Sequence, residues 1–264
     1  MPGQPAEDHD ATVVGVIGAR GGTGASVFAA ALARRAASGG AQTVLVDGDL
    51  TGGGIDVLLG IEDELGLRWP DLHAARGEVG GDELAALLPT WHGTRVLSAD
   101  RNRSGGLVGD APADVVRALV RAHEVVVVDL RREDLADARG LATAARCTVV
   151  VVVATRDLGS VAGALALHDA VVGAAPRAPL GMVVRGPAAG GLTAHDVAAA
   201  AGVDLWAELR SEPGLPASLE RGEGPAVRTR RGRGGDLGRA ARTVLDHARA
   251  VRRASNDQGA RRRR

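Results

Sequence analysis

The segment 12–37 constrains the fold most, because it reads as a strand, a glycine-rich turn and a helix in succession. Strand-forming residues fill 12–17, glycines recur over 18–24, and an alanine-rich stretch follows. The first amides of a helix have no partner within it, and the helix dipole adds about half a positive charge there. Glycines before such a helix let backbone N–H groups approach an anion closely. The segment therefore predicts a backbone cradle for phosphate.

The cradle lacks its usual ammonium group. Nucleotide-binding loops of this kind read G-x-x-x-x-G-K-[ST]. The frame that ends at Gly24 and Ser26 has Ala19 at the first glycine position and Ala25 at the lysine position. Ser26 keeps the hydroxyl that binds Mg²⁺ in such loops, but the chain contains no lysine at all. We expect this loss to weaken phosphate binding, and to weaken transition-state stabilisation more.

Carboxylates follow two further predicted strands. Asp47 and Asp49 come directly after the apolar run 43–46, and Asp129 closes the run 125–128 of four valines, a pattern typical of a strand buried on both faces. Strands alternate with helical patterns along the chain, which predicts a parallel sheet. The carboxyl ends of its strands share one edge, where ligands bind. We therefore expect the aspartates to meet the glycine loop and to position Mg²⁺, although each also suits a helix cap.

The heptapeptide RGGTGAS, residues 20–26, resembles the deviant Walker A motif KGGxGK[ST] of the MinD/ParA family of P-loop ATPases. It is most similar to the actinobacterial CpaE-like branch, which includes septum-site-determining proteins of the Ssd type. The resemblance spans nearly the whole chain and implies an α/β three-layer sandwich with a mostly parallel sheet. It also implies ATP and Mg²⁺ as ligands and a homodimer. The implied nucleotide-binding residues are Arg20, Gly21, Gly22, Thr23, Gly24, Ala25, Ser26, Arg185 and Pro213, and the implied magnesium residues are Ser26, Asp47, Asp49 and Asp129.

The resemblance assigns finer roles to some of these positions. Arg20 replaces the family's first lysine, which reaches the nucleotide of a partner subunit, and Asp49 matches the aspartate that helps to orient the attacking water. Asp129 opens switch II, where Leu130-Arg131-Arg132 replaces the usual small residues. The segment 50–60 corresponds to switch I, and its three consecutive glycines suit a loop that reshapes around a nucleotide.

Two positions lie where relatives border the purine base. Arg185 replaces an asparagine, and Pro213 lies in a Pro-Gly loop of a common kind. The sequence leaves open whether an arginine such as Arg156 or Arg185 replaces the missing lysine.

The composition of the chain limits which kinds of partner it can bind and which cellular compartment it suits. The formal net charge of zero argues against broad capture of nucleic acid. The single cysteine, Cys147, excludes an internal disulfide and fits a reducing compartment. No apolar stretch is long enough to span a bilayer, so we expect a cytoplasmic protein, recruited at most peripherally to membrane at a pole or septum. We expect a disordered leader at 1–11, one domain at 12–254 and a basic disordered tail at 255–264.

These features favour a nucleotide-responsive regulator. By resemblance, it would help to position the division septum or a Tad-type pilus or secretion machine through protein partners, with slow or absent ATP hydrolysis. A scaffold with a vestigial nucleotide site remains the alternative. A Rossmann-type dinucleotide enzyme is less favoured, because the glycine run does not fit G-x-G-x-x-G: from Gly22, the third glycine position is Val27. A DNA-binding role is the weakest, because the arginines cluster mainly near the C-terminus.

Overall fold

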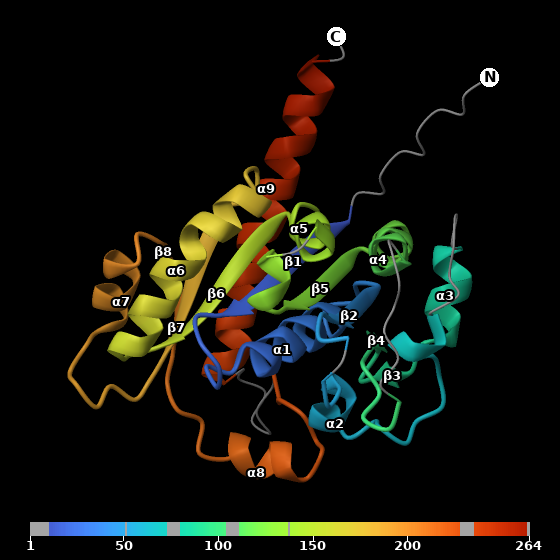
Figure 1. Ribbon diagram of the computed structural model, residues 1–264, viewed down its shortest axis with the longest axis horizontal. Coiled ribbons are helices and arrows are strands. Elements are labelled where there is room, and N and C mark those ends of the chain that lie inside the picture. The colour runs from blue at the N-terminus through green and yellow to red at the C-terminus, as the bar shows by residue number, and fades with distance from the viewer. Residues whose placement is uncertain are drawn as a thin grey trace.

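The computed structural model describes residues 11–50, 52–72, 80–103, 111–136, 138–227 and 235–262. An eight-stranded sheet with the order β3-β4-β2-β5-β1-β6-β7-β8 forms its centre (Figure 1). The strands are β1 Thr12–Gly18, β2 Thr43–Asp47, β3 Thr90–Trp91, β4 Thr94–Leu97, β5 Val125–Leu130, β6 Val149–Thr155, β7 Leu180–Arg185 and β8 Asp204–Leu209. The α-helices are α1 Ala25–Ala37, α2 Ile55–Leu59, α3 Gly81–Leu87, α4 Ala111–Ala122, α5 Ala138–Ala144, α6 Leu158–Ala174, α7 Ala194–Ala200, α8 Leu215–Glu220 and α9 Asp236–Arg262.

The sheet is covered on both faces, as the valine-rich strands predict. Alternate residues of β5 enter different cores: Val126 and Val128 pack toward α4, while Val125 and Val127 pack toward α1 and α9. Helices α6 and α7 extend the first of these layers over β6, β7 and β8. The α/β three-layer sandwich with a mostly parallel sheet is therefore confirmed.

One strand pair is antiparallel, and the sequence did not reveal it. Strands β3 and β4 form a hairpin whose turn is His92-Gly93. Both turn residues have positive φ, 45° at His92 and 82° at Gly93, as the tight turns that suit the twist of a hairpin require. Histidine is an uncommon residue there, and β3 spans only two residues, so the pattern carries little signal.

The strand order places the candidate site. Strand β1 pairs with β5 and β6 rather than with β2, whereas a dinucleotide-binding sheet places its first two strands side by side. This order rules against the Rossmann-type alternative. It also puts β5 between β1 and β2, so that Asp47 and Asp129 are register partners at the carboxyl edge.

The C-terminal helix is longer than the sequence suggests. Helix α9 runs to Arg262 and extends beyond the sheet (Figure 1), so residues 255–262 are helical rather than a disordered tail. Half of this segment, Ser255, Asn256, Asp257 and Gly259, consists of poor helix formers, so its helix continues one whose earlier turns are already docked on the sheet. Of the leader expected at 1–11, residues 1–10 lie outside the described residues, and Ala11 is buried in the core. Within the described part, no helix has the length and apolar character needed to cross a membrane.

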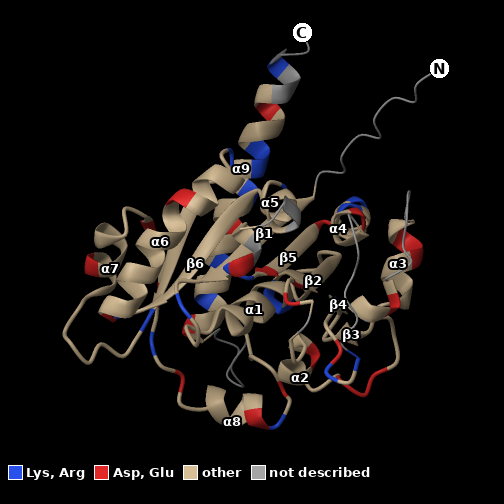
Figure 2. Ribbon diagram, viewed as in Figure 1, with Lys and Arg blue, Asp and Glu red and all other residues tan. Residues whose placement is uncertain are grey.

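Charges of both signs are spread over the elements of the sandwich (Figure 2). Many arginines there are paired with carboxylates, such as Arg117 with Asp114 at 2.6 Å and Arg131 with Asp49 at 2.8 Å.

Candidate functional site

A cavity of about 570 Å³ opens at the carboxyl edge of the sheet. Its size lies within the usual range for small-molecule sites. The loop after β1, the ends of β2 and β5, and the start of α2 enclose it. It is lined by Gly18, residues 20–27, Asp47, Asp49, residues 53–55, Leu58 and residues 129–133.

The glycine loop has the open shape that an anion cradle needs. Gly22 and Gly24 have φ of 76° and 88°, a conformation that disfavours side chains. A Cβ added at Gly21 or Gly22 would meet nothing within 4 Å. Gly24 is the N-cap of α1 and provides no side-chain cap, so the first amides of this thirteen-residue helix lack a capping side chain. The loop and helix therefore suit phosphate.

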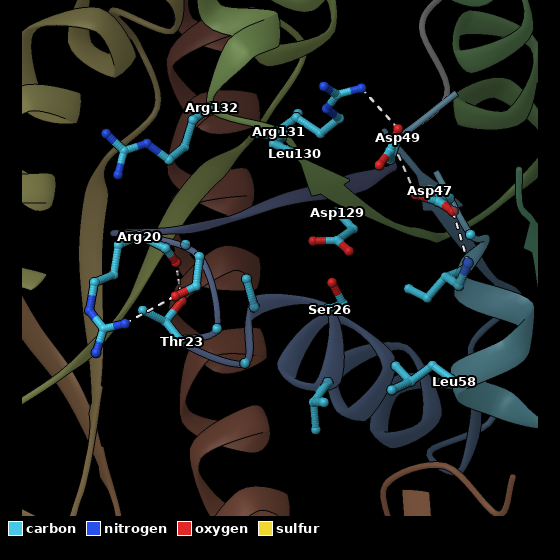
Figure 3. Close-up of a pocket in the computed structure, with 18 of the residues that line it drawn as sticks. Arg20, Thr23, Ser26, Asp47, Asp49, Leu58, Asp129, Leu130, Arg131 and Arg132 are labelled. Atoms are coloured by element: carbon cyan, nitrogen blue, oxygen red, sulfur yellow. Dashed lines mark hydrogen bonds and ion pairs between the residues drawn. The ribbon is translucent and has the colours of Figure 1, made fainter. Parts of the chain in front are cut away.

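Ser26 and Asp129 face each other across the cavity (Figure 3). Burial raises the pKa of Asp129 to about 6; the hydrogen bond from Ser26 opposes this shift, and the Asp49 charge adds to it. A carboxylate held in so unfavourable a setting gains from a nearby cation. A hydroxyl and a carboxylate are oxygen donors of the kind that Mg²⁺ prefers when phosphates supply further ligands.

Asp47 is fully engaged by the backbone. One carboxylate oxygen accepts from Asp49 N at 2.9 Å, and the other accepts from Ile55 N at 2.9 Å and Ala99 N at 3.4 Å. Burial and the Asp129 charge nevertheless raise the pKa of Asp47 to about 7. The carbonyl oxygen of Asp47 accepts from Trp69 Nε1 at 2.7 Å. Asp47 thus holds the start of α2 and the loop after β2 in place.

Asp49 is paired with an arginine. Its Oδ1 lies 2.8 Å from Arg131 Nη1, and the two side chains are 40% and 34% exposed. Asp47, Asp49 and Asp129 all line the cavity, but no three His, Cys, Asp or Glu side chains within the described ranges are grouped to hold a metal ion by themselves. Magnesium binding here would therefore depend on phosphate oxygens and Ser26 as well as on carboxylates.

Arg20 is held within its own chain. Its guanidinium donates to Asp157 at 2.8 and 3.3 Å, to Thr155 Oγ1 at 3.1 Å and to the Gly21 carbonyl at 3.1 Å. These hydrogen bonds help to keep the pKa of Asp157 well below its usual range. The side chain of Arg20 is 44% exposed and points away from Ser26 (Figure 3).

The two positions expected near the base lie apart from the cavity lining. Arg185 Nη2 donates to the Gly22 carbonyl at 3.2 Å, so Arg185 supports the glycine loop from outside. Pro213 is exposed in the loop before α8. Arg156 is paired with Glu208. The arginines that do line the cavity are Arg20, Arg131 and Arg132.

A buried ion pair fixes the segment after α2. Arg68 Nε lies 2.8 Å from Asp56 Oδ2, and each side chain is 5% exposed. The same guanidinium donates to the carbonyls of Ile61 at 3.0 Å, Gly66 at 3.2 Å and Glu64 at 3.3 Å. The region expected to act as a flexible switch I is thus anchored at its C-terminal end.

Sequence reasoning missed three parts of this arrangement. Arg68 and Trp69 brace the loops next to the cavity, and Arg132 Nη1 donates to the Ala19 carbonyl. The only signal for Arg132 was the departure of Leu130-Arg131-Arg132 from small residues. Trp69 is 1% exposed, and its indole nitrogen donates to the Asp47 carbonyl at 2.7 Å.

Comparison with protein-family models finds no match. Two curated relatives from Mycobacterium tuberculosis, the uncharacterized proteins Rv3660c and MT3760, are each 43% identical over 234 residues. That alignment covers 88% of this chain and 63% of each relative. The chain thus spans less than two thirds of the length of the relatives it matches.

Solved structures show the same fold at low sequence identity. MinD from Pyrococcus horikoshii, complexed with Mg-ADP, gives a TM-score of 0.73 at 17% identity, covering 91% of this chain and 98% of that one. A ParA family ATPase from Chlorobium tepidum gives 0.71 at 16%, covering 90% and 98%. A chain of the MinC:MinD cell division protein complex of Aquifex aeolicus gives 0.65 at 16%, covering 81% of this chain and 87% of that one. The chain therefore has the fold of MinD and ParA P-loop NTPases.

Proposed function

We propose that this protein is a nucleotide-responsive regulator of the MinD/ParA type, of the CpaE-like branch with a deviant Walker A motif. It binds Mg-ATP in the cavity at the carboxyl edge and hydrolyses it slowly or not at all. One observation carries the proposal: the N-terminus of α1, which has no side-chain cap, lines the same cavity as the facing side chains of Ser26 and Asp129. By resemblance, the regulated process is placement of the division septum or of a Tad-type pilus or secretion machine.

The residues present fit a magnesium nucleotide. The amides of Gly21–Ser26 would bind phosphate oxygens, while Ser26 and Asp129 would hold Mg²⁺ directly or through water. Asp49 would join them once it leaves Arg131, and Asp47 would keep the loop in place. The bound metal would neutralise phosphate charge. Because Ala25 provides no ammonium group, the transition state for phosphoryl transfer would be poorly stabilised.

Replacing Ser26 with alanine tests the magnesium site. We expect Mg-ATP to bind the wild-type chain more tightly than metal-free ATP, and Ser26→Ala to weaken Mg-ATP binding about tenfold and to remove most of that metal dependence. Titration calorimetry with Mg-ATP, Mg-ADP and ATP in chelator measures this. Ser38→Ala is the matched control, because Ser38 lies at the other end of α1 and its hydroxyl donates to the Arg35 carbonyl at 2.9 Å.

Arg20 tests the proposed dimer. In the described chain it is bound to Asp157, so action on a second subunit requires it to exchange that partner for the phosphates of the other nucleotide. We expect Mg-ATP to raise the dimer fraction and Arg20→Ala to abolish the rise, because the variant lacks the cation that bridges the subunits. Sedimentation with and without Mg-ATP measures the dimer fraction. Identical wild-type profiles under the two conditions would contradict dimerisation that depends on Mg-ATP.

The alternative is a scaffold with a vestigial site. It is favoured by the number of site groups already engaged in this chain: Arg20 by Asp157, and Asp49 by Arg131. In that case the fold would present surfaces to protein partners independently of nucleotide. Absence of both heat and thermal shift with millimolar Mg-ATP and Mg-ADP would support the scaffold over the regulator.

A further inference from the structure

Three arginines line the cavity that lacks a lysine, and each has a partner. Arg20 is bound to Asp157, Arg132 donates to the Ala19 carbonyl, and Arg131 is paired with Asp49. The three arginines differ in one respect: whether a magnesium nucleotide in the cavity would compete with the arginine for its present partner.

A magnesium nucleotide would not compete for two of these partners, Asp157 and the Ala19 carbonyl. Asp157 is the N-cap of α6, where it also accepts from Ser160 N at 2.8 Å, and it does not line the cavity. The Ala19 carbonyl is part of the backbone that leads into the glycine loop. A ligand in the cavity would leave Arg20 and Arg132 where they are, unless a second subunit intervened.

The partner of Arg131 is different, because Asp49 itself lines the cavity beside Asp129. The pair is partly exposed, at 34% and 40% for the two side chains, and ion pairs this exposed contribute little to stability. Arg131 also lies 3.5 Å from Glu133, whose side chain is 72% exposed. A divalent cation at Asp49 would therefore displace the guanidinium at small cost.

We infer that Arg131 supplies the positive charge that Ala25 lacks: it pairs with Asp49 in the absence of ligand and turns to the nucleotide phosphates when Mg²⁺ takes up Asp49. The inference rests on the proposed function. A guanidinium is well suited to the exchange, because its planar fork binds carboxylate and phosphate alike. The cation then comes from the residue that follows β5, on the side of the cavity away from Thr23 of the glycine loop (Figure 3).

Calorimetric titration of the full chain with Mg-ATP tests the inference. We expect Arg131→Ala to raise the Kd about tenfold or more, as loss of a charge-assisted hydrogen bond does. In the Ala25→Lys background the same substitution should raise the Kd less than about threefold, because the introduced ammonium already fills the role. Arg117→Ala removes a comparable exposed pair, with Asp114 at 2.6 Å on α4, and should leave the Kd unchanged.

A second arm separates phosphate binding from simple screening of Asp49. Removing Arg131 also removes a positive charge beside the Asp49 carboxylate, whose negative charge would then repel phosphate more strongly. In the Asp49→Asn background, titrated with ATP in chelator, that repulsion is gone. If Arg131→Ala still weakens ATP binding about tenfold there, the guanidinium binds phosphate; if the loss disappears, Arg131 only screens Asp49 and the inference is overturned.

The outcomes distinguish the two proposals. If Arg131→Ala binds Mg-ATP as tightly as the wild-type chain does, the inference is overturned and the proposed function still stands. The inference is also overturned if Arg131→Ala raises the Kd for Mg-ATP by the same factor with and without Ala25→Lys, because the two cations would then act independently. A wild-type chain that binds no Mg-ATP overturns both. Thermal unfolding of each variant confirms that affinities are compared between folded proteins.

Discussion

Arg68→Met is expected to lower the free energy of unfolding by about 3–5 kcal/mol, because it leaves the Asp56 carboxylate buried without its partner. The pair is almost fully buried, with both side chains 5% exposed. The carbonyls of Ile61, Glu64 and Gly66 lose a donor at the same time. Methionine fills much of the same volume, so the loss reports the charge and hydrogen bonds more than a cavity. For a chain of this size, we expect the melting temperature to fall by roughly 6–20 °C.

Arg103→Ala provides the matched control for that measurement. Arg103 pairs with Asp71 at 2.5 Å and with Asp100 at 2.6 Å, and the side chain of Arg103 is 50% exposed. Asp71 follows Arg68 closely in the chain and accepts from its backbone N–H at 2.8 Å. Exposed pairs contribute about 0–1 kcal/mol, so the melting temperature of Arg103→Ala should fall by only a few degrees. If thermal or urea unfolding shows Arg68→Met to be no less stable than Arg103→Ala, the buried network does not anchor the segment after α2.

Ala25→Lys is expected to tighten Mg-ATP binding by at least about tenfold. A charge about 4 Å from a phosphate oxygen gains about 4 kcal/mol at an effective dielectric near 20, before the cost of desolvating both groups. Ala25 lines the cavity as the first residue of α1, so the lysine enters where the backbone already favours an anion. Hydrolysis should rise as well, because the ammonium group can follow charge that develops in the transition state.

Ala37→Lys is a suitable control for the added charge, because Ala37 is the last residue of the same helix and lies far along it from the cavity. Calorimetry gives the affinity, and phosphate release gives the rate. An unchanged Kd for Ala25→Lys, beside a wild-type chain that binds, would mean that the phosphates do not lie against the start of α1. That result would exclude the arrangement proposed for Gly21–Ser26.

Local patterns were sufficient to predict the framework of the site. The four valines before Asp129 predict a buried strand, which β5 is. The glycines predict a loop that side chains do not obstruct, and a Cβ at Gly21 or Gly22 would meet nothing within 4 Å. Because carboxyl ends of parallel strands share an edge, the sequence was enough to predict that Asp47, Asp49 and Asp129 lie at the same edge as the loop, and all three line the cavity with it. Each of these signals is contained within a few consecutive residues of the chain.

The partners of the charged side chains could not be predicted in the same way. Arg20 lies 137 residues from Asp157, and Asp49 lies 82 residues from Arg131. Such pairs depend on which strands neighbour each other and on the direction of each side chain, and one sequence contains neither. The same limit explains why Arg156 and Arg185 were considered as replacements for the lysine, whereas Arg131 and Arg132 line the cavity.

Helix α2 is wedged between the cavity and a distant loop. At one end Asp47 holds the amide of Ile55; at the other, Gly60 packs so tightly on Gly222, just after α8, that a Cβ at Gly60 would lie 2.1 Å from the Gly222 carbonyl. The same five-residue helix therefore contacts both the wall of the cavity and the turn after α8, and a side chain at position 60 would disturb both contacts at once.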